Sequence, residues 1–258
     1  MDIAYDHISS YVFVADYGGQ ISVLKLESQG FQFITTLKGH QSSVRSLAYD
    51  QESRVLFSGG YDQIIVVWDI GSQKGTAYEL TGHKAKLTDL CFSPQVKRLL
   101  SSSERGNVGI WDLDIQREET AEWGGGSTCE KCGIPFFWNV KDMWTRKVIG
   151  VRQHHCRKCG RAVCAKCSEL ESTYPPMGFE IPVRMCQDCH ATVTTDDRTP
   201  LATFLEFKSD VTDMDLDEER WIWITVGSDK IIKVCVVGSH CSVVDLAVSS
   251  NLFDDTVW

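Results

Sequence analysis

The chain has 258 residues, with 35 acidic and 26 basic side chains and a formal net charge of −9 at pH 7. This length allows one large domain or two smaller ones, and the negative balance argues against nucleic acid as a partner. Residues 1–20 have neither a basic start nor an apolar core, so we expect no secretory signal, and no apolar run is long enough to span a bilayer. Eleven cysteines in such a chain are typical of a reducing, cytoplasmic compartment, where clustered cysteines bind metal more often than they form disulfides.

Two segments of the chain repeat each other at an offset of 43 residues, because residues 37–70 align with residues 80–113. Each copy has a Gly-His pair near its start and a Trp-Asp pair near its end. The alternating apolar runs between these pairs predict short strands separated by tight turns. A weaker copy covers residues 201–237, and residues 11–26 look like the last strands of a further copy.

This period, with its Gly-His and Trp-Asp pairs, resembles the WD40 repeat, in which each copy forms a four-stranded blade of a β-propeller. The resemblance implies a buried tetrad in the first copy, made of His40, Ser58, Asp62 and Trp68. Arg105 replaces the aspartate of the second copy, so we expect that network to be incomplete. In the third copy Phe207 replaces the histidine, whereas Asp229 is retained. We expect all these residues to be structural rather than catalytic.

The repeats predict three full blades and a partial one, whereas closed propellers contain about 4–8 blades. Open blade edges favour association. We therefore expect the chain either to be a truncated product or to pair with something else.

An insertion of different composition lies between the second and third copies, from residue 121 to residue 195. It contains four Cys-x-x-Cys pairs, namely Cys129/Cys132, Cys156/Cys159, Cys164/Cys167 and Cys186/Cys189. Two such pairs complete the closed four-cysteine site that structural zinc prefers, so the insertion predicts two zinc ions. Spacing alone leaves open whether sequential or alternating pairs share an ion. Cys91, Cys235 and Cys241 have no partner at ligand spacing, and we expect them to be free core cysteines.

The insertion also carries an acid-free basic island between Met143 and Ser168. Its members are Arg146, Lys147, Arg152, Arg157, Lys158, Arg161 and Lys166. With cysteine supplying every zinc ligand, His154 and His155 are free for other work. Guanidinium groups suit phosphate because their donors form a fork, and imidazole can donate to phosphate or gain charge near pH ~6.5. The island therefore indicates a phosphate site, the alternative being a solvated basic face without a dedicated ligand.

The segment RQHHCRKCG, residues 152–160, resembles the R-x-HHCR-x-CG motif of the FYVE zinc finger, and Arg184-Met185-Cys186 stands where that family has its RVC motif. FYVE domains bind phosphatidylinositol 3-phosphate on endosomal membranes. The resemblance implies alternating zinc pairs, the first with the third and the second with the fourth. It also implies a headgroup pocket lined by Arg152, His154, His155, Arg157 and Arg184. The family's W-x-x-D motif keeps Trp123 but has Gly126 in place of its aspartate, which predicts weaker or less selective lipid binding.

The residues before this motif are rich in apolar side chains. We expect Phe136, Phe137, Trp138, Met143 and Trp144 to pack as a local core. Val148, Ile149 and Val151 lie where FYVE fingers carry a membrane-inserting loop. An apolar tip beside Arg146, Lys147 and Arg152 suits a membrane interface, because apolar groups enter the acyl boundary while cations meet lipid phosphates.

The predicted fold is mostly β, with partial WD40 β-propeller blades and an inserted two-zinc FYVE-type finger. We expect WD40 repeats over residues 8–120, the finger over 121–195, a final degenerate blade over 199–237 and a C-terminal tail over 238–258.

This arrangement resembles the WD repeat and FYVE domain-containing proteins. The resemblance implies a non-enzymatic adaptor, cytoplasmic and peripheral on early endosomes, that binds the lipid through its finger. It also implies that the repeats bind signalling proteins, kinases among them. One alternative is a FYVE-related finger that binds only protein. The other is a RING-like ubiquitin ligase, which is disfavoured because RING domains usually place a histidine among their eight ligands and have no reason for the basic island.

Overall fold

The structure is a computed structural model of the whole chain. It describes residues 1–71, 77–115, 117–118, 121–220, 222–236 and 244–247. The chain divides into two compact units, which are described separately below. The first comprises residues 1–76, 82–115 and 202–258, and the second comprises residues 77–81 and 116–201. No helix in the described ranges is long and apolar enough to cross a bilayer.

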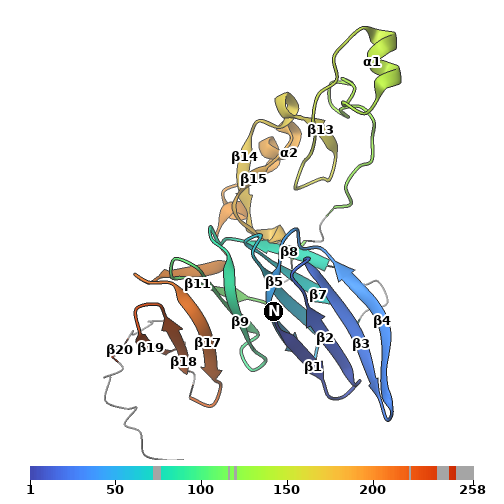
Figure 1. Cartoon of the computed structure of the whole chain (residues 1–258). Coiled ribbons are helices and arrows are strands. Elements are labelled where there is room, and N and C mark those ends of the chain that lie inside the picture. The colour runs from blue at the N-terminus through green and yellow to red at the C-terminus, as the bar shows by residue number, and fades with distance from the viewer. Residues whose placement is uncertain (72–76, 116, 119–120, 221, 237–243, 248–258) are drawn as a thin grey trace, which may run out of the picture. The chain divides into compact units, whose positions relative to one another are not determined.

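The first unit consists of antiparallel sheets that follow one another along the chain (Figure 1). The first sheet contains β1 (Ile3–Asp6), β2 (Tyr11–Ala15), β3 (Gln20–Glu27) and β4 (Gly30–Lys38). The second contains β5 (Val44–Asp50), β6 (Val55–Gly60) and β7 (Ile64–Asp69). The third contains β9 (Leu87–Ser93), β10 (Arg98–Ser103), β11 (Asn107–Asp112) and β16 (Ala202–Glu206). The fourth contains β17 (Val211–Asp217), β18 (Ile222–Gly227), β19 (Ile231–Val236) and β20 (Val244–Ala247).

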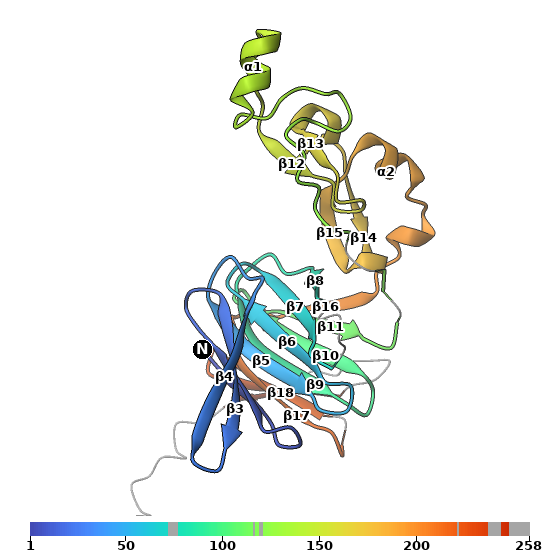
Figure 2. The ribbon, with the colours of Figure 1, turned by 90° about the vertical axis from the view of Figure 1, so that its right-hand side faces the viewer.

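The sheets pack on one another as successive blades, and Figure 2 shows them from the side. The first strand of each sheet contacts the first strand of the next, so that β1, β5, β9 and β17 form a row. Apolar residues that alternate along the strands fill the spaces between sheets. Phe13, Ile21 and Leu56 belong to the cluster between the first two sheets, and Leu100 and Trp223 to the cluster between the last two.

Two details differ from the expectation drawn from the repeats. The first sheet is complete rather than partial, because β1 and β4 flank the two strands that the sequence indicated. The boundaries of the sequence repeats also differ from the boundaries of the sheets. The strand at the start of the third copy, β16, pairs with β11 and completes the preceding sheet. The last sheet consequently takes its fourth strand, β20, from within the expected tail, where it pairs with β19.

The first repeat contains the tetrad that the resemblance implied. His40 Nδ1 lies 3.0 Å from Asp62 Oδ1, and His40 Nε2 lies 2.8 Å from Ser58 Oγ. Trp68 donates its indole N–H to the same Ser58 oxygen at 2.8 Å. These contacts tie together the strands of the second sheet and satisfy polar groups that would otherwise be buried without partners.

The second and third repeats depart from this network as expected. His83 Nε2 contacts Ser101 at 2.6 Å, but His83 Nδ1 has no hydrogen-bond partner among the described residues. Burial lowers the pKa of His83 to about 4, so this imidazole is neutral. In the last sheet Asp229 binds Lys233 at 2.6 Å instead of a histidine, and the lysine ammonium lies 5.6 Å from the centre of the Phe207 ring.

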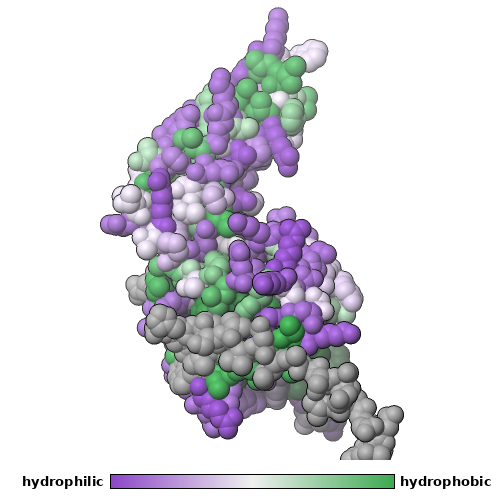
Figure 3. Space-filling model, turned by 90° about the vertical axis from the view of Figure 1, so that its left-hand side faces the viewer, coloured by the Kyte–Doolittle hydropathy of each residue, from purple (hydrophilic) through white to green (hydrophobic). Residues whose placement is uncertain are grey.

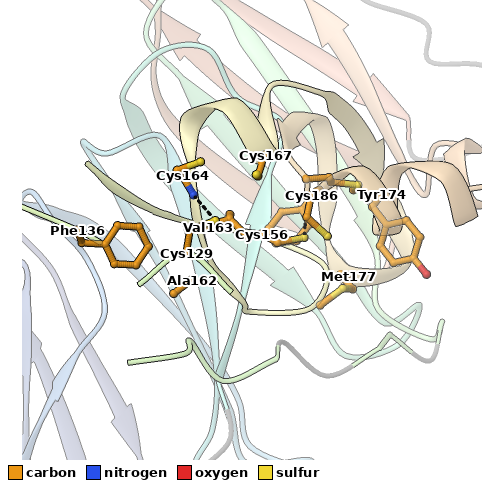
Figure 4. Packing of buried hydrophobic residues seen from close by; sticks show 12 residues of the cluster. Cys129, Phe136, Cys156, Ala162, Val163, Cys164, Cys167, Tyr174, Met177 and Cys186 are labelled. Atoms are coloured by element: carbon orange, nitrogen blue, oxygen red, sulfur yellow. Dashed lines mark hydrogen bonds between the residues drawn. The ribbon is translucent and has the colours of Figure 1, made fainter. Parts of the chain in front are cut away.

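The second unit is small and contains two hairpins. One is β12 (Gln153–His155) with β13 (Ala162–Cys164), and the other is β14 (Glu171–Tyr174) with β15 (Phe179–Arg184). The remaining elements are β8 (Ala77–Thr81), α1 (Val140–Arg146), α2 (Gln187–Thr192) and the 3-10 helices η1 (Ala165–Ser168), η2 (Pro175–Met177) and η3 (Asp196–Arg198). Cysteines make up much of the unit's core, together with Phe136, Tyr174, Met177 and Phe179 (Figure 4).

Candidate metal centres and basic site

The eight paired cysteines of the second unit gather into two clusters of four. One consists of Cys129, Cys132, Cys164 and Cys167, and the other of Cys156, Cys159, Cys186 and Cys189. Within each cluster all sulfur atoms lie within 4.8 Å of one another. The pairs therefore alternate along the chain, as the resemblance implied and as spacing alone left open.

The donor set fits zinc. A tetrahedral zinc with Zn–S bonds of about 2.3 Å places its sulfur atoms about 3.8 Å apart. The sulfur atoms of Cys132 and Cys164 are 3.8 Å apart, and those of Cys159 and Cys186 are 3.9 Å apart. Two such sites agree with the prediction of two Zn²⁺ ions, which is confirmed. Bound zinc cross-links two chain segments through four cysteines in each cluster, so it stabilises a unit with little other apolar mass.

Tight turns hold each first cysteine pair in place. Gly160 follows Cys159 with φ +70°, and a Cβ there would lie 2.1 Å from the Glu122 carbonyl oxygen, so only glycine fits. The amide of Gly160 donates to the Cys156 carbonyl at 2.9 Å. Gly133, after Cys132, repeats this geometry with φ +70°.

Backbone amides also favour the thiolate form that metal binding requires. The Cys164 amide donates to the Cys129 sulfur at 3.3 Å, and the Cys186 amide donates to the Cys156 sulfur at 3.2 Å. Burial raises the pKa of Cys129, but hydrogen bonds from backbone amides outweigh it and bring that pKa to about 7.

The two other described cysteines, Cys91 and Cys235, lie in the first unit. Cys235 is fully buried and Cys91 is partly buried, as expected of core cysteines. Burial raises the pKa of the Cys91 thiol to about 12, so this group is not a reactive thiolate. Cys241 lies outside the described residues.

Three residues of the expected headgroup pocket lie close enough for the charges of two to act on the third, and two of them, His154 and Arg184, each come two residues before a cysteine of the second cluster. Arg152 precedes β12, His154 lies within it, and Arg184 ends β15. The pKa of His154 is lowered by partial burial and by the positive charges of Arg184 and Arg152. Arg184 is held in place by donating to the Ser168 carbonyl at 2.7 Å. This part of the surface therefore concentrates positive charge, for which an anion is the natural partner.

The other two expected pocket residues meet at Trp123. The ring of His155 stacks on Trp123 with centroids 4.7 Å apart and planes 16° apart. The guanidinium of Arg157 lies 4.8 Å from the Trp123 ring centre, and His155 Nε2 donates to the Gly124 carbonyl at 3.0 Å. Neighbouring strand residues point to opposite faces, which explains why His154 and His155 have different partners.

The two groups of basic residues are joined through the backbone. The amide of Arg157 donates to the carbonyl of Arg184 at 3.0 Å. The Arg157 guanidinium lies against Trp123, while the backbone of Arg157 is bonded to that of Arg184. The sequence indicated Trp123 only as part of a motif, and its contacts with His155 and Arg157 come from the structure.

Gly126, which replaces the motif aspartate, occupies an ordinary position. A Cβ there would meet the Thr128 carbonyl oxygen at 3.4 Å and Glu130 Cγ at 3.9 Å, which are normal contacts. The local backbone would thus accept an aspartate. The carboxylate is therefore missing only because residue 126 is glycine, and the backbone conformation does not exclude an aspartate there.

The apolar segment before the basic motif is more exposed than the sequence suggested. Phe136 is buried, and Met143 accepts a hydrogen bond from the Gly150 amide. Phe137, Trp138 and Trp144 are exposed, so the prediction that they pack in a local core is wrong. Trp144 belongs to α1, in which no residue is buried, and Phe137 and Trp138 lie just before that helix.

The residues of the predicted membrane loop are likewise partly exposed and partly packed against the rest of the unit. Ile149 is 85% exposed and Val148 is 40% exposed. Val151 instead packs against the cysteine core, and its backbone forms a bridge with Phe136, so it supports the base of the loop. Figure 3 shows hydrophobic side chains gathered beside hydrophilic ones at the end of the unit that carries α1. Trp144, 85% exposed, adds to this apolar surface.

Comparison with known proteins agrees with both parts of the chain. The family model described as FYVE zinc finger matches residues 123–195. The model described as WD domain, G-beta repeat, matches residues 31–69 and 74–112. A solved structure of the VHS and FYVE tandem domains of Hrs is 30% identical over 28% of each chain, with a TM-score of 0.23.

Curated relatives share both domains by name. Human WD repeat and FYVE domain-containing protein 1 is 56% identical over 90% of this chain and 57% of its own length. Human WD repeat and FYVE domain-containing protein 2 is 54% identical over 90% of this chain and 58% of its own. The Caenorhabditis elegans protein 2 is 43% identical over 90% and 57%. The chain thus spans a little over half the length of these relatives, and it belongs to the family of proteins that combine WD repeats with a FYVE zinc finger.

Proposed function

We propose that the finger binds phosphatidylinositol 3-phosphate and that the chain acts as an adaptor on early endosome membranes. The observation that supports this most is the cluster of Arg152, His154 and Arg184, joined through the backbone to Arg157 on Trp123. Guanidinium forks and imidazole donors match the oxygens of a phosphorylated headgroup. The zinc clusters hold these side chains on a rigid support.

The exposed apolar surface supports a membrane as the place where this headgroup is met. Val148 and Ile149 are exposed beside Arg146, Lys147 and Arg152. Burial of one such apolar side chain in the acyl boundary contributes roughly 1.5–3 kcal/mol. A cation near an anionic surface adds about 1 kcal/mol. The loop and the headgroup site therefore contribute separately and can be tested separately.

The repeats suit the protein-binding half of an adaptor. The histidines and serines of the tetrads are buried and committed to hydrogen bonds inside the blades, which supports a structural and not a catalytic role for them. The blade surfaces would carry signalling proteins, including kinases, to the membrane. The adaptor is thus proposed to work by co-localisation, without chemistry of its own.

A finger that binds only protein is the second candidate, and Gly126 favours it. Without the motif carboxylate, the site has one polar contact fewer with which to orient a headgroup. A ubiquitin ligase of the RING type has less support, because both zinc clusters consist of cysteine alone.

Liposome co-sedimentation of the zinc-loaded chain distinguishes these functions. Vesicles would carry phosphatidylinositol 3-phosphate, its 4-phosphate isomer or unphosphorylated phosphatidylinositol. Arg157→Ala is expected to abolish selective binding to the 3-phosphate, whereas Lys166→Ala, at an exposed position of η1, removes the same charge and leaves selectivity intact. Soluble headgroup should displace the parent chain. Binding that ignores the phosphate position and resists the competitor would leave the protein-only finger.

A further inference from the structure

Four large apolar side chains of the second unit are exposed and belong neither to the metal centres nor to the basic site. They are Phe137, Trp138, Val140 and Trp144, and each has more than half of its surface in solvent. All four lie in α1 or just before it, at the end of the unit remote from β14 and β15 (Figure 1 and Figure 2). These four side chains are here called the α1 surface. Exposed apolar patches of this kind mark interaction surfaces.

The apolar side of α1 is distinct from the side that packs on the finger. Val140 and Trp144 are four positions apart, so they lie on the same side of the helix. Met143 instead contacts the base of the loop, where its sulfur accepts the Gly150 amide at 2.9 Å. A Cβ at Gly150 would lie 2.6 Å from that sulfur, which shows how closely the two residues pack. The helix is therefore attached through Met143, and Val140 and Trp144 remain in solvent.

Both ends of the helix are fixed to the finger. At the start, the Asn139 side chain donates to the Ser127 carbonyl at 3.3 Å. At the end, Arg146 donates to the carbonyl of Gly133 at 2.8 Å, in the turn that follows the zinc ligand Cys132. The metal centre thus supports the helix, and the exposed side chains are held in a defined arrangement.

The α1 surface leads directly into the predicted membrane loop. Lys147 ends the helix in the left-handed region with φ 53°, and the Val148 amide donates to the Met143 carbonyl at 3.2 Å. Ile149 follows five positions after Trp144, so the helix and the loop are parts of one structure. A bilayer that receives the loop therefore lies close to the helix as well.

The charges around the α1 surface favour a lipid surface as its partner. Lys141 and Lys147 are exposed, and neither has an ion-pair partner in the described part of the chain. Asp142 is the only acid between residues 131 and 168, and it pairs with Arg146 at 3.8 Å. Lysine is depleted in protein interfaces. Aromatic side chains beside unpaired lysines are instead typical of segments that lie at an anionic membrane surface.

We propose that the α1 surface is a second membrane anchor of the finger, in addition to the loop of Val148 and Ile149. Its partner is the boundary between headgroups and acyl chains in a bilayer rich in anionic lipid. Indole rings favour this depth, because the ring is apolar and its N–H group reaches water. Lys141 and Lys147 meet lipid phosphates in the same position.

This inference rests on the proposed function only in that the finger meets a membrane, and it does not require recognition of the 3-phosphate. A second anchor has a clear use in this chain. The headgroup site has Gly126 in place of the motif aspartate, and contacts with the bilayer that do not depend on the headgroup compensate for the missing contact.

Binding of the zinc-loaded chain to phosphatidylserine vesicles that contain phosphatidylinositol 3-phosphate tests the proposal. Trp144→Ser is expected to weaken binding roughly tenfold or more, as the loss of one large buried apolar side chain implies. Trp144→Phe should keep most of the affinity. Phe31→Ser removes a similarly exposed ring from β4 of the first unit, and this matched control should bind like the parent. Zinc content and circular dichroism check that each variant is folded.

The soluble 3-phosphate headgroup separates this proposal from the proposed function. Trp144→Ser should bind it as tightly as the parent does, because the anchor contacts the bilayer and not the headgroup. A parent without preference for the 3-phosphate would contradict the proposed function, whereas a vesicle-specific loss in Trp144→Ser would still support the anchor. A folded Trp144→Ser chain that binds vesicles as tightly as the parent would overturn the anchor and leave a protein as the partner of this surface. Equal losses for vesicles and soluble headgroup would also overturn it.

Fluorescence quenching measures directly whether the ring enters the bilayer. Vesicles with bromine near the headgroup end of the acyl chains should quench the tryptophan emission of the parent. Trp144→Phe should lose a share of this quenching, whereas Phe31→Ser should not. Equal quenching of the parent and Trp144→Phe would place this ring outside the bilayer and contradict the proposal.

Discussion

Replacing Trp123 with alanine tests whether this ring positions the basic site. The substitution removes the contact with the Arg157 guanidinium at 4.8 Å and the stack with His155 at 4.7 Å. An exposed cation–π contact contributes about 0.5–1 kcal/mol and an aromatic pair about 0.5–1.5 kcal/mol. If both contacts hold the site in its binding geometry, their loss weakens headgroup affinity by roughly 5- to 60-fold, since about 1.4 kcal/mol corresponds to a factor of ten.

Calorimetric titration with a soluble, short-chain phosphatidylinositol 3-phosphate measures this change without a contribution from the apolar loop. Trp123→Phe keeps a ring face for both partners and is expected to recover most of the affinity. Zinc content and thermal unfolding of each variant show whether the finger remains folded. A folded Trp123→Ala chain that binds the soluble lipid as tightly as the parent would refute the positioning role.

Three further predictions concern the motif, the metal and pH. Gly126→Asp is expected to raise selectivity for the 3-phosphate over the 4-phosphate in liposome binding, because the backbone accepts a Cβ there. Unchanged selectivity would show that a carboxylate at residue 126 does not contribute to headgroup recognition. Cys132→Ser should reduce bound zinc from two ions to one by native mass spectrometry and unfold that half of the finger, whereas Cys91→Ser should keep both ions. Lowering the pH from 8 to 5 should destabilise the first unit, because unfolded His83 takes up a proton near its usual pKa of 6.5 while burial holds the folded pKa at about 4. This difference in proton uptake lowers the free energy of unfolding by about 2 kcal/mol at pH 5. In denaturant titrations at the two pH values, the parent should therefore lose more stability than His83→Gln. Equal losses in the two proteins would contradict this prediction.

The sequence predicted the features that depend on residue spacing. Four Cys-x-x-Cys pairs indicated two zinc ions whatever their pairing, because the chemistry of the thiolates decides the metal. The 43-residue period located the tetrad of His40, Ser58, Asp62 and Trp68, and Arg105 predicted the gap beside His83. These predictions concern local chemistry, which a short segment of chain contains within itself.

The features that the sequence did not predict depend on what surrounds a residue. The identities of Phe137, Trp138 and Trp144 do not reveal that these side chains are exposed, since exposure depends on which other segments pack against them. Likewise, the Gly-His pairs mark the repeat but not the sheet, so the strand at Val244–Ala247 was assigned to a tail. The contacts of Trp123 with Arg157 and His155 were also missed, because more than thirty positions separate these side chains from it along the chain.

The proposed function depends above all on recognition of the phosphorylated headgroup by the basic site. It is tested most directly by titrating the zinc-loaded, isotope-labelled chain with soluble phosphatidylinositol 3-phosphate and following backbone amide resonances by NMR. Saturable shifts are expected at His154, Arg157 and Arg184, with much smaller changes when the 4-phosphate isomer is added. Resonances of these three residues that stay unmoved, or that move equally with both isomers, would contradict it.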